Sequence, residues 1–406
     1  MRETDFKQTT IGSIPEGWQE KSLVDVAPLQ RGFDLPQSKL RKGSYPVIYS
    51  NGIGTFHADY KCCAPGLITG RSGTLGKFTL IKEGYYWPHN TTLWVTNFNS
   101  NNPVFLYYLY STLSFELSGT GTGVPTLNRN YLKEIRLKIP PKEEQQRIAQ
   151  VLEYTDDLIF NLKKLIEKKR AIKTGALSQL LSGKLRLPGF SEPWISTSLD
   201  ELGVLLSNNT LSRENLTKSG TIGNIHYGDI LTKFGAILDL DNTAIPFIHP
   251  QMSSKFLKSH LAKEGDVIFA DTAEDETVGK ATELVNVKDR AIVSGLHSFW
   301  FRPLTKFASK YLGYAVNSHE FHQQAIPVIS GTKVCSISKP NLLSFTLTYP
   351  SELEEQKAIA KVLTDMDEEI SALEAKLKKY KQLKKGMMQQ LLTGKIRLVS
   401  PKESLS

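Results

Sequence analysis

The chain of 406 residues carries 50 lysines and arginines against 41 aspartates and glutamates, and its net charge of +9 favours an anionic partner without identifying one. Its three cysteines, Cys62, Cys63 and Cys335, are too few for a disulfide framework. The sequence contains no apolar run of about 18 residues, the length that a membrane-spanning helix needs. Because the N-terminus has no secretory signal pattern, we expect a cytoplasmic protein, and the length predicts two to four structural units.

Residues 1–142 form the first predicted globular domain. Its β-branched runs broken by glycines, such as "GLITGRSGTLGKFTLI" from Gly66, are typical of strands joined by turns. This stretch differs from a phosphate-binding loop, because Arg71 stands where that loop needs a glycine and Phe78 where it needs Ser or Thr. "NNPVF" from Asn101 is the nearest match to the base-pocket motif of adenine methyltransferases, but Val104 replaces its second proline. We therefore predict neither nucleotide binding nor methyl transfer here.

A long helix is predicted over 143–182. It follows two prolines and has Glu143 and Glu144 in its first turn, where negative charge suits the helix dipole. Apolar residues recur with a mean spacing of about 3.5, which is typical of a coiled coil. We call this row of apolar residues the seam, and the polar residues Thr155, Lys169 and Lys173 interrupt it. The residues that we expect to pack against another helix are Ile148, Leu152, Ile159, Leu162, Ile166 and Leu180.

Residues 183–350 form the second predicted globular domain. Its acidic stretch "FADTAEDETVGK" from Phe269 could suggest a metal-dependent nuclease, but the first domain has no matching carboxylates, which favours a solvated loop. His319 and His322 are the only closely spaced histidines, and no cysteine lies near them in the sequence. We therefore predict no metal site and no catalytic residue in this chain.

A second long helix is predicted over 351–393, followed by a tail over 394–406. Residues 354–398 repeat residues 143–187 without a gap and with nearly half of the positions identical, so the chain contains a duplication. Each predicted helix is followed by a glycine, Gly183 or Gly394, as helices commonly are. Lys384 interrupts the second seam. Its expected packing residues are Ile359, Leu363, Met366, Ile370, Leu373, Leu377, Tyr380 and Leu391.

Both helices carry an internal glycine at the same repeat position, Gly175 and Gly386. Glycine costs about 1 kcal/mol relative to alanine inside a helix. We interpret the pair as a kink or a point of close approach, although shared ancestry alone would also explain it.

The globular domains match each other only at scattered positions, among them "GTGVPTLN" from Gly121 and "GTKVCSIS" from Gly331. This contrast with the closely matching helices indicates a common framework that carries two different recognition modules. The fold class is therefore α+β, with two domains of mixed α/β content separated by two long helices and related by an internal pseudo-two-fold repeat.

The repeat, the helix entry "P-x-x-EEQ-x-x-IA-x-VL" and the helix exit "QLL-[ST]-G-K-[LI]-R" together resemble the specificity subunit of type I restriction-modification enzymes. The resemblance covers the chain from Trp18 to about Leu398. It implies that 1–142 and 183–350 are target-recognition domains, each reading half of a bipartite DNA site. It also implies that the helices pair antiparallel as a coiled coil and set the gap between the half-sites.

The same resemblance implies partners. Two methyltransferase subunits would bind the chain, and two translocating nuclease subunits could join them. S-adenosylmethionine, ATP and Mg²⁺ would then be bound only by those partners, and this chain would need no cofactor. Two alternatives remain open, a DNA adenine methyltransferase, fused or standing alone, and a coiled-coil scaffold without DNA binding.

The candidate DNA contacts lie in the globular domains, where polar residues occupy glycine-bearing loops and turns. Phosphates are contacted by Arg, Lys, Ser, Thr and Asn side chains, whereas contacts to base edges provide specificity. The lysine-rich helix segments are better explained as solvated faces or partner surfaces. The candidates are Asn51, Arg71, Lys77, Thr120, Thr122, Asn128, Arg129, Lys280, Thr332, Lys333 and Ser336.

Overall fold

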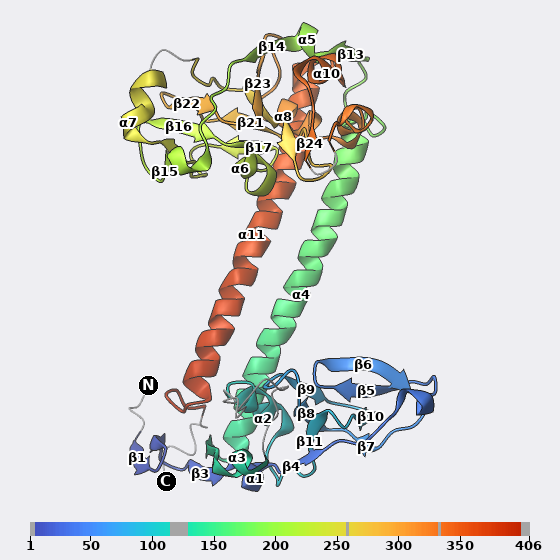
Figure 1. Cartoon of the computed structure of the whole chain (residues 1–406), viewed down its shortest axis with the longest axis vertical. Coiled ribbons are helices and arrows are strands. Elements are labelled where there is room, and N and C mark those ends of the chain that lie inside the picture. The colour runs from blue at the N-terminus through green and yellow to red at the C-terminus, as the bar shows by residue number, and fades with distance from the viewer. Residues whose placement is uncertain (1–4, 114–128, 257–259, 332–333, 399–406) are drawn as a thin grey trace. The chain divides into compact units, whose positions relative to one another are not determined.

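The computed structural model describes residues 5–113, 129–256, 260–331 and 334–398. The chain divides into two compact units, unit 1 with residues Met1–Lys163 and Ala375–Ser406, and unit 2 with residues Lys164–Glu374. Each unit therefore combines one mixed α/β domain with half of each long helix (Figure 1). The predicted fold class is confirmed.

Unit 1 contains two four-stranded sheets in the orders β6-β5-β10-β7 and β4-β11-β8-β9, and two-stranded sheets β1-β2 and β12-β3. Strands β5 and β10 run parallel. The strands are β1 (Phe6–Thr9), β2 (Gly12–Pro15), β3 (Gln19–Ser22), β4 (Leu29–Arg31), β5 (Tyr45–Tyr49), β6 (Gly52–His57), β7 (Cys62–Cys63), β8 (Gly66–Gly70), β9 (Phe78–Ile81), β10 (Tyr85–Pro88), β11 (Thr92–Val95) and β12 (Arg136–Ile139). The short helices are α1 (Leu23–Val26), η1 (Gln37–Lys39), α2 (Pro103–Tyr110) and α3 (Arg129–Glu134).

Unit 2 contains a five-stranded sheet β14-β23-β19-β21-β17, a four-stranded sheet β15-β18-β16-β22, and two-stranded sheets β13-β25 and β20-β24. Strands β16 and β22 run parallel. The strands are β13 (Trp194–Ser198), β14 (Gly203–Leu206), β15 (Leu216–Thr217), β16 (Ile222–Ile225), β17 (Ile237–Asp239), β18 (Phe247–Ile248), β19 (Val267–Ala270), β20 (Thr272–Ala273), β21 (Ala281–Val285), β22 (Ala291–Ser294), β23 (Ser298–Pro303), β24 (Cys335–Ser336) and β25 (Thr346–Pro350). The short helices are α5 (Leu199–Leu202), η2 (Arg213–Asn215), α6 (Tyr227–Thr232), α7 (Pro250–Ser253), η3 (Ser254–Phe256), α8 (Tyr311–Ala315), α9 (His319–His322), η4 (Ile326–Val328) and α10 (Lys339–Ser344).

The same central strand pair organises both domains. Strand β8 is buried at every residue and so is β19, because their apolar sequences face covered surfaces on both sides. In unit 1 Ile68 lies opposite Trp94, and in unit 2 Ile268 lies opposite Trp300. This shared register gives the two domains a common frame despite their different sequences.

The stretch "NNPVF" is a helix start in this structure. The Asn102 side chain accepts hydrogen bonds from the amides of Val104 and Phe105, both at 2.9 Å, and Pro103 occupies the first turn of α2. Asn and Pro favour these two positions for ordinary helix-capping reasons.

The long helices are α4 (Lys142–Leu180) and α11 (Leu353–Leu391), each of 39 residues. Within each unit, the first half of one helix lies beside the second half of the other, so the pairing is antiparallel (Figure 1). Gly183 and Gly394, just past the helix ends, have φ of +69° and +74°. They terminate the helices in the left-handed conformation that glycine favours.

The seam residues anchor the helices in the domain cores as well as to each other. Ile148, Leu152 and Leu391 belong to the core of unit 1, which also contains Trp18 and Phe105. Leu180, Ile359 and Leu363 belong to the core of unit 2. Three further predicted seam residues are buried, namely Ile159, Leu162 and Ile166, as is Ile370, whereas Met366, Leu373, Leu377 and Tyr380 are half-buried.

The lysines that interrupt the seam form ion pairs between the helices. In unit 1, Lys384 binds both carboxylate oxygens of Asp156, at 2.6 and 2.7 Å, and the Tyr108 hydroxyl donates to the same carboxylate at 2.7 Å. In unit 2, Lys173 pairs with Asp367, to which the Tyr314 hydroxyl donates at 2.8 Å. The two triads occupy equivalent repeat positions, and each fixes one domain to both helices.

The repeated entry and exit motifs bind each other. Arg397, after α11, binds Glu144 at the start of α4 through Nε and Nη2, both at 2.8 Å. Arg186, after α4, binds Glu355 at the start of α11 at 2.6 and 2.7 Å. Both glutamates are almost fully buried. The motif recurs because the arginine after each helix binds the glutamate at the start of the other helix. We call the pairs Arg397–Glu144 and Arg186–Glu355 the entry–exit clamps.

The glutamine of each entry motif ties its helix to the neighbouring domain. The Gln145 side chain accepts from the Asn102 amide and donates to the Pro140 carbonyl, both at 2.9 Å. The Gln356 side chain accepts from the Ala308 amide at 3.0 Å and donates to the Pro350 carbonyl at 2.9 Å. Both glutamines are buried, so the motif serves helix start, clamp and domain together.

The internal glycines do not mark a point of close approach. A Cβ placed at Gly175 or at Gly386 would meet no atom within 4 Å outside its immediate helical surroundings. The predicted close approach is therefore wrong, because the space beside both positions is open.

Candidate nucleic-acid interface

Polar loops follow the parallel strands at one edge of each domain. In unit 1, residues 49–52 run from the last residue of β5 to the first of β6, and residues 89–91 follow β10. In unit 2, residues 226–228 follow β16 and residues 295–297 follow β22. Because parallel strands end at the same edge of a sheet, these loops lie together. Residues 71–77 after β8 and residues 271–280 after β19 join them. We call these segments the strand-end loops.

One backbone framework holds the strand-end loops in both units. The Arg71 amide donates to the Thr91 carbonyl at 2.8 Å, and the Asp271 amide donates to the His297 carbonyl at 3.2 Å. The His89 amide donates to the Ile48 carbonyl at 2.9 Å, and the Gly295 amide donates to the Ile225 carbonyl at 2.8 Å. Equivalent positions thus present different side chains: Arg71 matches Asp271, and Thr91 matches His297.

The structure brings together two of the predicted contacts in unit 1. The Lys77 ammonium group donates to the Asn51 carbonyl at 2.7 Å, and both residues are exposed. Arg71 lies in the same loop as Lys77 but turns elsewhere, because it lines a cavity of about 490 Å³ with Gln30 and Arg31. Its buried Nε atom has no hydrogen-bond partner.

Lys280 and Ser336 have partners within unit 2. The Lys280 ammonium group donates to the Leu231 carbonyl at 2.9 Å, and burial lowers its pKa. This placement suits a structural bond better than a DNA contact. Ser336 pairs with Thr272 across β20 and β24, which joins the second glycine phrase to the strand-end loops. Arg129 begins α3, and Thr120, Thr122, Asn128, Thr332 and Lys333 lie outside the described residues.

Sequence reasoning missed the aromatic and imidazole side chains of the strand-end loops. In unit 1 the rings of Tyr49 and His89 lie 4.5 Å apart, and in unit 2 those of Tyr227 and His297 lie 5.3 Å apart. Aligning "YYWPHNTTLWV" from Tyr85 with "AIVSGLHSFWF" from Ala291 would have indicated His89 and His297, which lie in matching segments between two strands.

A charged cluster supports the strand-end loops of unit 2. Arg213 binds the buried Asp229 carboxylate at 3.0 Å, and Lys233 binds it at 2.7 Å. Burial works to raise the pKa of Asp229, but the hydrogen bonds from Lys233 and Arg213 leave it below its usual value. Burial, followed by the nearby Arg213 charge, lowers the pKa of His226, and burial lowers that of His89. Both imidazoles are therefore neutral at neutral pH.

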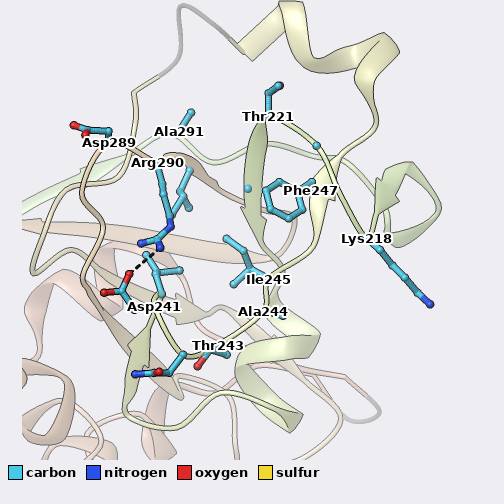
Figure 2. Close-up of a pocket in the computed structure, with 15 residues that line it drawn as sticks. Lys218, Thr221, Asp241, Thr243, Ala244, Ile245, Phe247, Asp289, Arg290 and Ala291 are labelled. Atoms are coloured by element: carbon cyan, nitrogen blue, oxygen red, sulfur yellow. Dashed lines mark hydrogen bonds and ion pairs between the residues drawn. The ribbon is translucent and has the colours of Figure 1, made fainter.

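A larger cavity of about 670 Å³ lies elsewhere in unit 2 (Figure 2). Figure 2 shows Arg290 turned toward Asp241, and the two form an ion pair at 2.8 Å. Lys288 also binds Asp241. Asp241 is thus neutralised by two basic side chains, and none of the lining residues belongs to a strand-end loop.

Among the described residues, no group of three or more His, Cys, Asp or Glu side chains could hold a metal ion. Asp275 of the acidic stretch accepts from the Thr277 amide at 2.9 Å, and a ring nitrogen of His322 lies 2.8 Å from the Glu276 carbonyl oxygen. No helix of the described part is both long and apolar enough to cross a bilayer.

Known proteins resemble the chain over nearly its whole length. The MjaVIII type I restriction enzyme specificity subunit of Methanocaldococcus jannaschii is 27% identical over 427 aligned positions, covering 98% of this chain and 97% of the relative. The MjaIX specificity subunit of the same organism is 31% identical over 189 positions, 40% of this chain and 43% of the relative.

Solved structures share the fold. A crystal structure of a type I restriction-modification S subunit from M. genitalium aligns with a TM-score of 0.58 and 15% identity, over 92% of this chain and 96% of that one. A structure described as showing complex assembly and conformational transition of a type I restriction-modification system aligns with a TM-score of 0.54 and 16% identity, over 94% of this chain and 99% of that one.

The family model described as the type I restriction modification DNA specificity domain matches the chain twice, over residues 15–173 and 191–385. Each match takes in one globular domain together with most of the helix that follows it. The chain therefore belongs to the type I restriction-modification specificity subunits, the non-catalytic DNA-specificity component of these systems.

Proposed function

We propose that each unit reads one half of a bipartite DNA target through its strand-end loops. The observation that carries the proposal is one backbone framework that presents different polar side chains in the two domains, as in the pairs Arg71 and Asp271, or Thr91 and His297. A shared frame with different contact groups is what two readers of two different short sequences require, because base edges are distinguished by donor and acceptor patterns.

The paired helices would set the number of unread base pairs between the half-sites. Each helix has 39 residues, which corresponds to about 58 Å of axis. Half-sites read on one face of B-DNA lie about 34–36 Å apart or at multiples of that distance. The seam ion pairs and the entry–exit clamps support a rigid spacer, because they join the two helices along their length and at their ends.

Methyltransferase subunits would dock on the helical halves of the two units. Unit 1 exposes the apolar side chains of Val151, Tyr154 and Phe160 on α4, and unit 2 exposes Leu165 and Ile172 on the same helix. Aromatic side chains such as those of Tyr154 and Phe160 are enriched at protein interfaces. One set in each unit agrees with two methyltransferase subunits, and S-adenosylmethionine would be bound by them. Nuclease subunits with ATP and Mg²⁺ would join that assembly.

The test is expression of the chain with its methyltransferase subunit, followed by sequencing of the methylated DNA. We expect one motif made of two short half-sites and an unread gap, and co-purification that is lost when Tyr154 and Phe160 are both replaced by arginine. Lys357→Glu, an exposed change outside the apolar set, serves as the control. Methylation by this chain alone, or a continuous motif, would contradict the proposal.

A further inference from the structure

Arg71 and Asp271 occupy the same place in the two domains. Each directly follows the buried central strand, β8 or β19, and each donates its amide to the strand-end loop after β10 or β22. The opposed residues Ile68 and Trp94 of unit 1 match Ile268 and Trp300 of unit 2, which fixes the register of the comparison. The two side chains therefore leave the framework at equivalent points.

The two side chains have opposite hydrogen-bonding character. A guanidinium group only donates, whereas an ionised carboxylate only accepts. The Arg71 Nε atom is buried without a partner, and the side chain lines the 490 Å³ cavity together with Gln30, Arg31 and Thr96. The Arg71 guanidinium group therefore offers hydrogen-bond donors beside the open volume of this cavity.

Asp271 has acceptor capacity left over. Its Oδ1 atom accepts from the Thr272 hydroxyl at 2.7 Å and lies 3.5 Å from His297 Nδ1. Its Oδ2 atom has no hydrogen-bond partner in the part of the chain that the structure describes. The side chains of Asp271 and His297 are 20% and 48% exposed, so a ligand can reach them.

We propose that this position sets base specificity in both half-sites, an inference that rests on the DNA-reading function proposed above. Arg71 reads a guanine in the half-site of unit 1, because arginine pairs with the O6 and N7 acceptors of guanine. Asp271, assisted by His297, reads a base with an exocyclic amino group, cytosine or adenine, in the half-site of unit 2, because a carboxylate accepts from such a group. The pair therefore makes the two halves chemically different.

The experiment compares the methylated motifs of assembled complexes that carry Arg71→Gln or Asp271→Ala. Arg41→Gln, which changes an exposed arginine paired with Asp59, and Asp289→Ala, which changes an exposed aspartate outside the strand-end loops, are the matched controls. We expect Arg71→Gln to relax one guanine of one half-site, and Asp271→Ala to relax one adenine or cytosine of the other half-site. The controls should keep the wild-type motif.

A variant too weak to methylate is measured by binding of its purified complex to duplexes that carry each of the four bases at the affected position. Discrimination at that position should fall on the order of ten- to a hundred-fold, while discrimination in the other half-site is retained. This inference alone is overturned by any of three results. The motifs stay unchanged, a variant binds all four duplexes equally more weakly, or both variants alter the same half-site. A wild-type complex without a bipartite motif overturns the proposed function, and this inference with it.

Discussion

At the scale of single residues, glycines show how position decides the effect of one methyl group. Gly394 has φ of +74°, and a Cβ there would overlap the Pro15 ring, whereas a Cβ at Gly386 would meet nothing within 4 Å. Both glycines belong to or follow α11. The first is required by backbone geometry and packing, and the second only weakens a helix.

Alanine substitution should therefore have opposite effects at the two positions. Gly394→Ala should lower the free energy of unfolding by more than about 1 kcal/mol, because it adds a strained φ and a clash. Gly386→Ala should raise it by up to about 1 kcal/mol, because alanine favours the helix interior. Urea denaturation of the two variants checks this, and a loss of equal size at both positions would contradict it.

A buried carboxyl group makes stability depend on pH. Glu283 is 2% exposed, and it accepts from the amides of Lys310 and Gly313 at 2.6 and 2.7 Å. Burial outweighs these bonds and raises its pKa from 4.5 to about 7. Between those values the folded state binds more protons than the unfolded state, so the contribution of Glu283 to stability falls as the pH rises from about 4.5 to about 7.

Glu283→Gln should remove this contribution. The free energy of unfolding of the wild type, measured in urea at pH 5 and at pH 7.5, should fall more between the two values than that of the variant. The exposed Glu320→Gln change is the control and should keep the wild-type slope. Parallel slopes for the wild type and Glu283→Gln would show that the Glu283 pKa is not raised.

At the scale of elements, the duplicated helices were predictable, and the loops that they position were only partly so. A spacing of 3.5 residues and a terminal glycine are local signals, and they placed both helices within two residues of their observed ends. The partners of the polar seam residues were not predictable, since Lys384 meets Asp156 only after the chain has returned. The Lys280 bond was not predictable either, because nothing local reveals the Leu231 carbonyl 49 residues away.

The entry–exit clamps should contribute more to stability than the exposed ion pairs of the same helices. Arg397→Ala leaves Glu144, whose side chain is 2% exposed, without its countercharge, and should cost about 3–5 kcal/mol. Arg186→Ala should do the same to Glu355. Arg170→Ala breaks an exposed pair with Glu374 and should cost at most about 1 kcal/mol. Chemical denaturation that finds all three losses alike would contradict the assignment.

At the scale of the whole molecule, the duplication repeats a globular domain followed by a long helix, and the exit motif of each helix binds the entry motif of the other. The well-matched repeat encodes the helix starts, the clamps and the seam ion pairs, which both units share. The domains keep a backbone frame while the strand-end loops vary in chemistry. This separation explains why gapless similarity is confined to residues 143–187 and 354–398, and why the sequence alone indicated the architecture but not the contact residues.

The most direct measurement of the central claim is the methylated motif of a complex whose helices have both been lengthened by one heptad, in the paired segments between the domains. Insertion of seven residues adds about 10 Å to each helix and preserves the seam. We predict that the unread gap lengthens while both half-sites keep their bases. Altered half-site bases with an unchanged gap would contradict the account.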